Sequence, residues 1–306
     1  MIDYLFHRFN ASSFRLAMSI VVKNEADIIE ASIRTHSNLG VDAFAIMDNN
    51  SSDGTREILA RLQSEFEIII VDERGIFKQA KWMRQLAGIA KQKLKADWVI
   101  NNDADEFWLP RNGLSLKQNL AFKGSVLTCS RYNMLLDEVC NASGNCFDAQ
   151  YYVTTPIAYP KGTIQTNKKR SCLLGKIGPK VIVNPHGLIS LRSGNHKALH
   201  IANMLDYLIP GYDSIKRFGK IEVFHYPIRS YAQFETNVIN RRHLIECGIT
   251  VGPHYRRWVQ ILNQGGLMEE FNMNFVQSST DIETLCKYDI VRMDPSIRKA
   301  IVSNRV

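Results

Sequence analysis

Two aspartates with one residue between them follow an apolar run, and they are the part of the sequence best suited to chemistry. The stretch WVINNDADEFWLP covers residues 98–110, and its first three residues are aromatic or β-branched, which predicts a buried strand. In an extended backbone, Asp103 and Asp105 would leave the strand on the same face. Two carboxylates that close repel unless a cation or a proton neutralises them. The pair therefore predicts a divalent ion held by oxygen ligands, or alternatively a polar turn capped by aspartate.

The elements that must position this pair alternate regularly through the first half of the chain. Apolar runs predict strands, and the intervening segments carry apolar residues at helical spacing, with Ser52 and Asp53 as capping residues and Gly40 as a stop. The expected strands are 15–22, 42–48, 67–73 and 97–103, and the expected helices are 25–40, 51–63 and 78–94. This alternation predicts an α/β fold with a mostly parallel sheet flanked by helices.

Polar residues follow each expected strand, as the two aspartates follow the fourth. In parallel sheets of this kind ligands bind at the carboxyl ends of the strands, so these groups should gather at one rim. They are Lys23, Asn24 and Glu25 after the first strand, residues 48–55 after the second, and Asp72, Glu73 and Arg74 after the third. Each group alone would also suit a turn or a helix start. Their convergence favours a ligand site.

Composition limits the setting of such a site. The chain has 306 residues, 45% of them hydrophobic, which is enough for one large α/β unit or for one domain with an appendage. No apolar run approaches the roughly 20 residues of a membrane span, and the first residues do not resemble a signal peptide. The six cysteines are scattered without a Cys-x-x-Cys pair, which indicates a reducing cytosol. The net charge of +8 invites anionic partners without choosing among them.

Three motifs in order resemble those of a known family. VVKNEADIIE, DNNSSDGT and DWVINNDADEF look like the N-terminal landmarks of family 2-like inverting glycosyltransferases, in the branch with a DADEF form of the metal motif. The resemblance covers about residues 15–110. It implies the GT-A nucleotide-diphospho-sugar transferase fold, with a less regular C-terminal acceptor region.

The resemblance also implies roles for individual residues. The first strand end at Val22 to Glu25 and the second at Asp48 would hold the base and ribose of a nucleotide, and Asp103 and Asp105 would hold Mn²⁺ or Mg²⁺ on its diphosphate. Such an ion offsets the charge that grows on the leaving group. The full set expected at the nucleotide is Val22, Lys23, Asn24, Glu25, Asp48, Asn50, Asp53, Gln79, Arg84 and Asp103, although Arg84 could instead face water.

The second half offers weaker candidates. IEVFHY alternates like a strand and ends in His225, a candidate third metal ligand by resemblance, for which His196 competes. An inverting transferase needs a base for the acceptor hydroxyl, and Asp137 or Glu138 could serve, or could be exposed loop acids. HYRRW at 254–258 lacks the glutamine placement of processive synthases, so a processive synthase is not expected.

Together these features predict a metal-dependent glycosyltransferase acting on a nucleotide-diphospho-sugar donor and a glycan or glycolipid acceptor. We expect a nucleotide-sugar-binding half at 1–110, an acceptor-binding half at 111–240 and a helical extension at 241–306. A cytoplasmic enzyme working at the inner membrane face, with peripheral membrane association, would fit surface-glycan synthesis. The alternatives are a noncatalytic nucleic-acid-binding domain, which leaves the acidic rim unexplained, and a magnesium-dependent phosphatase, whose aspartate motif belongs on the first strand.

Overall fold

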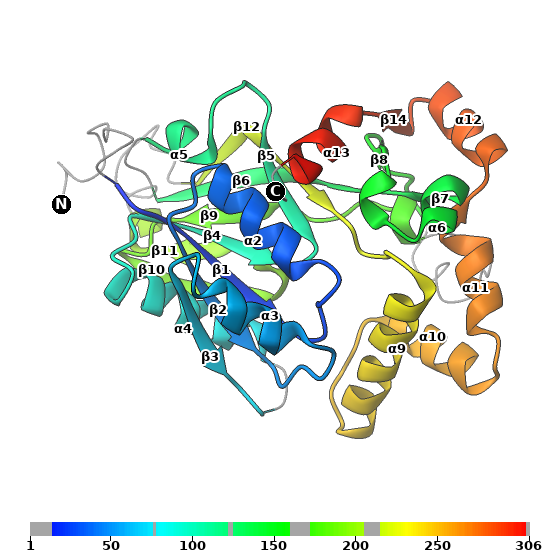
Figure 1. Ribbon diagram of the computed structural model, residues 1–306, viewed down its shortest axis with the longest axis horizontal. Helices are drawn as coiled ribbons and strands as arrows, with labels where there is room; N and C mark the ends of the chain where they lie inside the picture. The colour runs from blue at the N-terminus through cyan, green and yellow to red at the C-terminus, as the bar shows by residue number, and fades with distance from the viewer. Residues whose placement is uncertain (1–13, 76–77, 122–124, 160–171, 205–214, 304–306) are drawn as a thin grey trace. The chain divides into compact units, whose positions relative to one another are not determined.

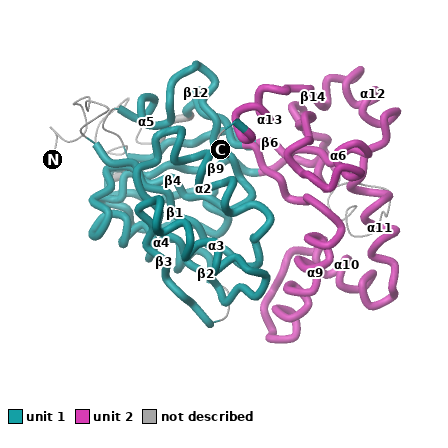
Figure 2. The backbone as a smooth tube through the Cα atoms, in the orientation of Figure 1, with its two compact units in different colours: residues 1–131, 178–223, 303–306 teal, residues 132–177, 224–302 magenta. Residues whose placement is uncertain are grey.

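The computed structural model describes residues 14–75, 78–121, 125–159, 172–204 and 215–303 (Figure 1). The chain divides into two compact units, drawn in different colours in Figure 2. The first unit comprises residues 1–131, 178–223 and 303–306, and the second comprises 132–177 and 224–302. These bounds differ from the divisions expected at 110 and 240, because a strand at Lys180–Val183 returns to the sheet that the first hundred residues begin.

A mixed sheet organises the first unit, and within the described residues it has eight strands in the order β3-β2-β1-β4-β9-β6-β12-β5. The strands β3, β2, β1 and β4 are parallel neighbours, and β9 runs antiparallel to both β4 and β6. Their bounds are β1 Leu16–Val22, β2 Ala43–Asp48, β3 Ile68–Asp72, β4 Trp98–Asp103, β5 Glu106–Pro110, β6 Val126–Asn133, β9 Lys180–Val183 and β12 Ile215–His225. The four parallel strands are those expected from the sequence, which confirms the α/β prediction.

The expected helices also form, each between two of these strands. Besides α2, α3 and α4, the first unit holds the short α5, the hairpin strands β10 and β11, and the 3-10 turns η3 and η4. The bounds are α2 Ile29–Asn38, α3 Thr55–Leu62, α4 Gln79–Gln92, α5 Leu116–Asn119, β10 Leu188–Leu191, β11 Ala198–His200, η3 Ser193–Asn195 and η4 Ile201–Met204. Gly40 follows α2 with φ of 99°, a left-handed conformation that glycine adopts without strain, so it ends the helix as expected.

The start of α3 differs from the expected cap. Gly54, with φ of 95°, is the residue before the helix, and its lack of a side chain leaves no capping oxygen. Asp53 nevertheless accepts hydrogen bonds from the Thr55 N–H at 3.0 Å and from the Thr55 hydroxyl at 2.5 Å. The expected capping role of Asp53 is therefore performed from one residue further back, whereas Ser52 is exposed.

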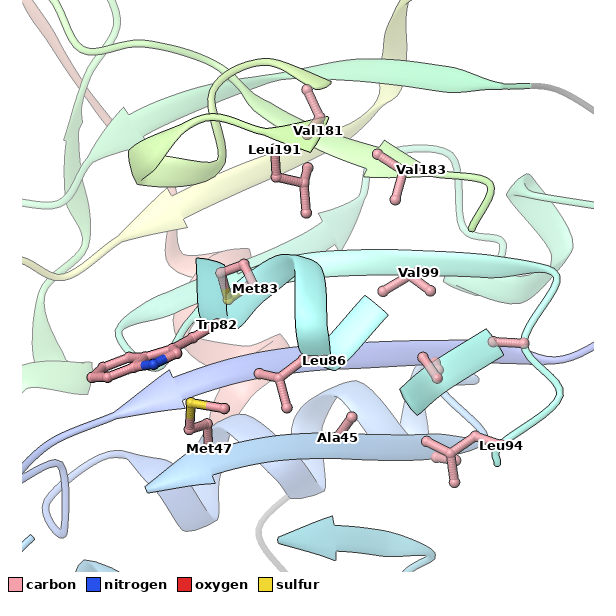
Figure 3. Packing of buried hydrophobic residues seen from close by; sticks show 14 of the residues in the cluster. Ala45, Met47, Trp82, Met83, Leu86, Leu94, Val99, Val181, Val183 and Leu191 are labelled. Carbon is pink, nitrogen blue, oxygen red and sulfur yellow. The ribbon is translucent and has the colours of Figure 1, made fainter. Parts of the chain in front are cut away.

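One face of the sheet is covered by α4. Its buried residues Trp82, Met83 and Leu86 lie in a core cluster with side chains of β2, β4 and β9 (Figure 3). Small residues of the strands, such as Ala17 and Ala45, let the helix approach closely. Burying each large apolar side chain contributes about 1.5–3 kcal/mol. The helix is therefore firmly seated, and its first turn lies where the site described below is built.

A buried polar chain connects α2 to the end of β4. His36 is fully buried, and burial lowers its pKa to about 4, so the imidazole is neutral. Its Nδ1 donates to the Ser32 carbonyl at 2.7 Å, and its Nε2 accepts from the Trp108 N–H at 3.0 Å. The Trp108 indole in turn donates to Asn102 Oδ1 at 2.7 Å. This chain holds the residue that precedes Asp103 in place.

The second unit consists of helices with two small two-stranded sheets. Its elements are β7 Leu136–Asp137, α6 Glu138–Ser143, η1 Cys146–Asp148, β8 Tyr151–Val153, η2 Cys172–Leu174, α9 Tyr231–Glu246, α10 Pro253–Asn263, α11 Leu267–Asn274, β13 Val276–Gln277, α12 Ser279–Lys287, β14 Val291–Met293 and α13 Pro295–Val302. Aromatic rings join three helices, since the ring centroid of Phe234 in α9 lies 5.1 Å from that of Trp258 in α10 and 6.0 Å from that of Phe271 in α11. Among the described residues, no helix has both the length and the apolar character that a membrane crossing needs.

Candidate active site

The carboxyl ends of the four parallel strands lie at one edge of the sheet. Val22 of β1 pairs in register with Asp48 of β2, and Asp48 pairs with Asp72 of β3. On the other side of β1, Val21 pairs with Asp103 of β4. Asp48, Asp72 and Asp103 therefore lie along one edge of the sheet, as the alternation of strands and helices predicted.

The loops after β1 and β2 are joined by hydrogen bonds. The Asn24 N–H donates to Ser51 Oγ at 2.9 Å, and Asn24 Oδ1 accepts from the Ser52 N–H at 2.9 Å. The Ser51 hydroxyl donates to Asp48 Oδ1 at 2.5 Å. Asn24 and the exposed Asn50 have φ of 57° and 55°, left-handed values that asparagine tolerates better than most residues. These bonds make the two loops one preformed rim.

Further contacts extend this rim. The Glu25 N–H donates to Thr55 Oγ1 at 2.8 Å, and the Ala26 N–H donates to Asp53 Oδ2 at 3.0 Å. Partial burial alone would raise the pKa of Asp53, but the hydrogen bonds from Thr55 and Ala26 outweigh it and lower the pKa. The Lys23 ammonium donates to the Asn49 carbonyl at 3.0 Å. The residues expected to hold a nucleotide therefore also hold one another.

Asp103 is surrounded by nitrogen donors. Its Oδ2 lies 2.5 Å from the ammonium of Lys180 at the start of β9, and its Oδ1 accepts from the Gln79 amide at 3.0 Å. The amide of Asn195 in η3 adds a longer contact to Oδ1 at 3.4 Å. The Asp103 side chain is 26% exposed. It thus reaches the surface while being held by groups on three other segments, β9, α4 and η3.

Lys180 is fully buried and contacts a second carboxylate. Its ammonium lies 3.0 Å from Glu106 Oε1, and Glu106 also pairs with Arg131 at 2.7 Å. Burial by itself would lower the pKa of Lys180, but the charges of Asp103 and Glu106 outweigh it and raise the pKa, so the lysine is charged. The cluster contains two acids and two bases. Its formal charges therefore cancel.

The first turn of α4 ties Asp103 to η3. Gln79 Oε1 accepts from the Gly194 N–H at 2.9 Å, while the Gln79 amide nitrogen donates to Asp103. Gly194 and Asn195 have φ of 75° and 55°, and this left-handed pair turns the η3 backbone toward α4. His196, the competing metal candidate, has its Nδ1 2.7 Å from the Pro179 carbonyl. Gln79, which was expected at the nucleotide, thus contacts Asp103 directly, whereas Arg84 is exposed.

The geometry inferred for the two aspartates was wrong in one respect. Ala104 and Asp105 form a turn between β4 and β5, so the chain is not extended from Asp103 to Asp105 and the same-face argument does not apply. Within the described residues, no group of three or more histidine, cysteine, aspartate and glutamate side chains is arranged to hold a metal. Asp103 and Asp105, both half-buried, offer the oxygen ligands that Mg²⁺ and Mn²⁺ prefer, so the ligand type fits.

The remaining candidates lie in the second unit. His225 Nδ1 is 2.8 Å from Asn133 Oδ1, and its metal role stays a prediction. Asp137 caps α6 by accepting from the Cys140 N–H at 2.7 Å. Glu138 is exposed and accepts from the Ser279 N–H at 3.3 Å. Asp137 and Glu138 thus have structural contacts, and neither contact tests a catalytic role.

The sequence reading missed Lys180, Glu106 and Asn195. Glu106 was visible in the DADEF motif, and Lys180 was visible as a charge opening the apolar strand KVIV. A charge at such a position predicts a buried partner, because lysine is rarely buried without one. The partner itself is 77 residues away in the chain. No local pattern identified it.

In an α/β unit of this kind ligands bind at the carboxyl edge of the parallel strands, and here that edge carries carboxylates and amides. Residues 19–133 match the sequence model of the family described as Glycosyl transferase family 2. Over these residues the chain is similar to that family, and the match supports a glycosyltransferase. The matched segment runs from within β1 to the end of β6 and contains the whole acidic edge.

Solved structures were also compared with the chain. Residues 1–349 of S. aureus TarS, crystallised with UDP-GlcNAc, show 13% identity and a TM-score of 0.44 over 95% of this chain and 79% of that one. Glucosyl-3-phosphoglycerate synthase from Mycobacterium tuberculosis, crystallised with Mg²⁺ and UDP, shows 16% identity and a TM-score of 0.36 over 79% of this chain and 82% of that one. The comparison with curated proteins returned no match.

Proposed function

We propose that the protein transfers a sugar, with inversion, from a nucleotide-diphospho-sugar to a glycan or glycolipid acceptor, with the help of Mn²⁺ or Mg²⁺. The observation that carries the proposal is the alignment of Asp48 and Asp103 at the carboxyl edge of β2 and β4, the parallel strands on either side of β1, within the segment that matches family 2. A noncatalytic nucleic-acid-binding protein would have no use for this acidic edge.

The contacts at the edge suggest that different residues hold the nucleoside and the cation. The rim from Val22 to Glu25, braced by residues 48–55, would hold the base and ribose in a preformed loop. Asp103 and Asp105 would hold the cation, which when bound offsets the charge on the leaving diphosphate. Gln79 and Lys180 keep the Asp103 carboxylate in one orientation. Preformed donors and carboxylates need little rearrangement when charge develops.

We propose that the acceptor binds to the second unit. That unit contains a cavity of about 230 Å³ lined in part by Asn274, Gln277 and Thr284. Asn274 is buried, and within the described part of the chain neither its amide nitrogen nor its amide oxygen has a hydrogen-bond partner. An amide can both donate to and accept from a hydroxyl group, which a glycan offers in number. Asp137 or Glu138 would then take the proton of the reacting hydroxyl. Because the chain is basic, it would suit an acceptor displayed at the anionic cytoplasmic face of a membrane.

Removal of the divalent ion is expected to weaken nucleoside diphosphate binding. Calorimetric titration with UDP and with GDP, in Mn²⁺ and after chelation, measures this directly. We expect one of the two to bind in Mn²⁺ and to lose about tenfold or more in affinity after chelation, because the diphosphate charge is then unscreened at an acidic edge. Equal affinity after chelation would remove the metal role proposed for Asp103 and Asp105.

A further inference from the structure

The ion pair between Lys180 and Asp103 sits where a metal would meet the same carboxylate. We propose that Lys180 is a positioning residue that serves as a built-in counter-ion for Asp103, so that the divalent ion binds only together with a diphosphate. The inference rests on the proposed function, because it concerns the order in which metal and donor reach that site. The Lys180 ammonium is 2.5 Å from Asp103 Oδ2 and is shielded completely from solvent.

Lys180 is more than the structural partner of Glu106. Glu106 is itself fully buried and already has a cation of its own, since Arg131 lies 2.7 Å from the same oxygen. Asp103 is the member of the cluster that reaches the surface, and Lys180 is the only cation that the ion pairs of the described residues give it. Lys180 therefore neutralises the outward-facing carboxylate, and Arg131 neutralises the inward-facing one.

This balance has a consequence for metal binding. With two acids and two bases the cluster is formally neutral, so it does not attract a divalent ion as a bare carboxylate pair would. A cation approaching Asp103 also meets the like charge of Lys180 at the adjacent oxygen, in surroundings that screen charge poorly. A diphosphate changes the balance, because its negative charges attract the ion and offset the repulsion from Lys180.

The experiment is a titration of the full-length protein with Mn²⁺, with and without UDP or GDP, in which free Mn²⁺ is measured by its electron paramagnetic resonance signal. The variants are Lys180→Met, which keeps the length of the side chain without the charge, and Lys180→Arg, which keeps the charge. Lys117→Met is the matched control, since Lys117 pairs with Asp42 at 2.7 Å in the same unit and away from this edge. Circular dichroism checks that each variant folds.

We expect the wild type, Lys180→Arg and Lys117→Met to bind Mn²⁺ only when the nucleoside diphosphate is present. Lys180→Met should bind Mn²⁺ without nucleotide at least about tenfold more tightly than the wild type, because Asp103 then lacks its counter-ion. Its dependence of metal binding on nucleotide should shrink accordingly. A residue that only supported the fold would not produce this gain.

Two results would overturn the inference. One is wild-type protein that binds Mn²⁺ as tightly without nucleotide as with it, a measurement that needs no variant to fold. The other is folded Lys180→Met with unchanged affinity for Mn²⁺ in the absence of nucleotide. A failure of the proposed function looks different: neither nucleoside diphosphate would bind to the wild type, whatever Mn²⁺ does.

Discussion

Asp105→Asn is expected to abolish sugar transfer while leaving the fold intact. The amide keeps the size of the side chain and removes the charge that a divalent ion needs, and loss of electrostatic stabilisation of this kind costs about a hundredfold or more in turnover. Asp105 lies half-buried in the turn between β4 and β5, where asparagine is well tolerated. Turnover and melting temperature of the purified variant, measured beside the wild type, provide the test.

Asp103→Asn is expected to affect stability more than Asp105→Asn does. Asp103→Asn removes the charge that faces Lys180, and a buried charge deprived of a partner destabilises a protein by about 1–3 kcal/mol or more. We therefore expect Asp103→Asn to melt at a lower temperature than Asp105→Asn, although both lose activity. If Asp105 were only a turn residue, asparagine would replace it well and the variant would stay active. An active Asp105→Asn enzyme would contradict the metal site.

Asp48→Ala is expected to weaken nucleoside diphosphate binding while leaving its dependence on Mn²⁺ intact. The buried Asp48 carboxylate accepts from the Ser51 hydroxyl and from the Ser51 N–H at 3.2 Å, and it would also accept from the base or ribose. A hydrogen bond to a charged group is worth about 1.5–3 kcal/mol, so the dissociation constant should rise by about tenfold or more. Calorimetry in Mn²⁺ and after chelation measures both quantities.

Ser51→Ala separates the two roles of Asp48. This variant removes the hydroxyl that links Asp48 to the loop after β1, but it keeps the carboxylate. If Asp48 contacts the nucleotide, Ser51→Ala should weaken binding less than Asp48→Ala does. Equal losses in the two variants would mean that Asp48 acts only by bracing the loop. A loss of Mn²⁺ dependence in Asp48→Ala would place Asp48 at the metal instead.

The parallel half of the sheet could be predicted because its information is local. Each of β1 to β4 is an apolar run, and helices such as α4 repeat Trp82, Leu86 and Ala90 at helical spacing, so type and order follow from periodicity. Parallel register then places Asp48 and Asp103 at one edge without any knowledge of their contacts. The rim and the acidic edge could therefore be predicted from the sequence.

The contacts that set the chemistry of Asp103 could not be predicted in the same way. Lys180 and Asn195 reach it from 77 and 92 residues further along the chain, by way of an antiparallel strand and a 3-10 turn. Periodicity carries no information about such pairs. The turn at Ala104 and Asp105 was one of the two alternatives that the sequence left open, because residue types alone do not decide between an extended chain and a turn after an apolar strand.

We propose that this edge binds a nucleotide-diphospho-sugar and activates its glycosyl bond. Release of nucleoside diphosphate from a panel of nucleotide sugars, measured with the wild-type protein in Mn²⁺, tests this most directly, since glycosyltransferases can transfer the sugar slowly to water when no acceptor is supplied. We predict that one nucleotide sugar of the panel is hydrolysed, that chelation stops the release and that Asp105→Asn does not catalyse it. If every nucleotide sugar of the panel stays intact and none raises the melting temperature of the protein, this edge is not a nucleotide-sugar site.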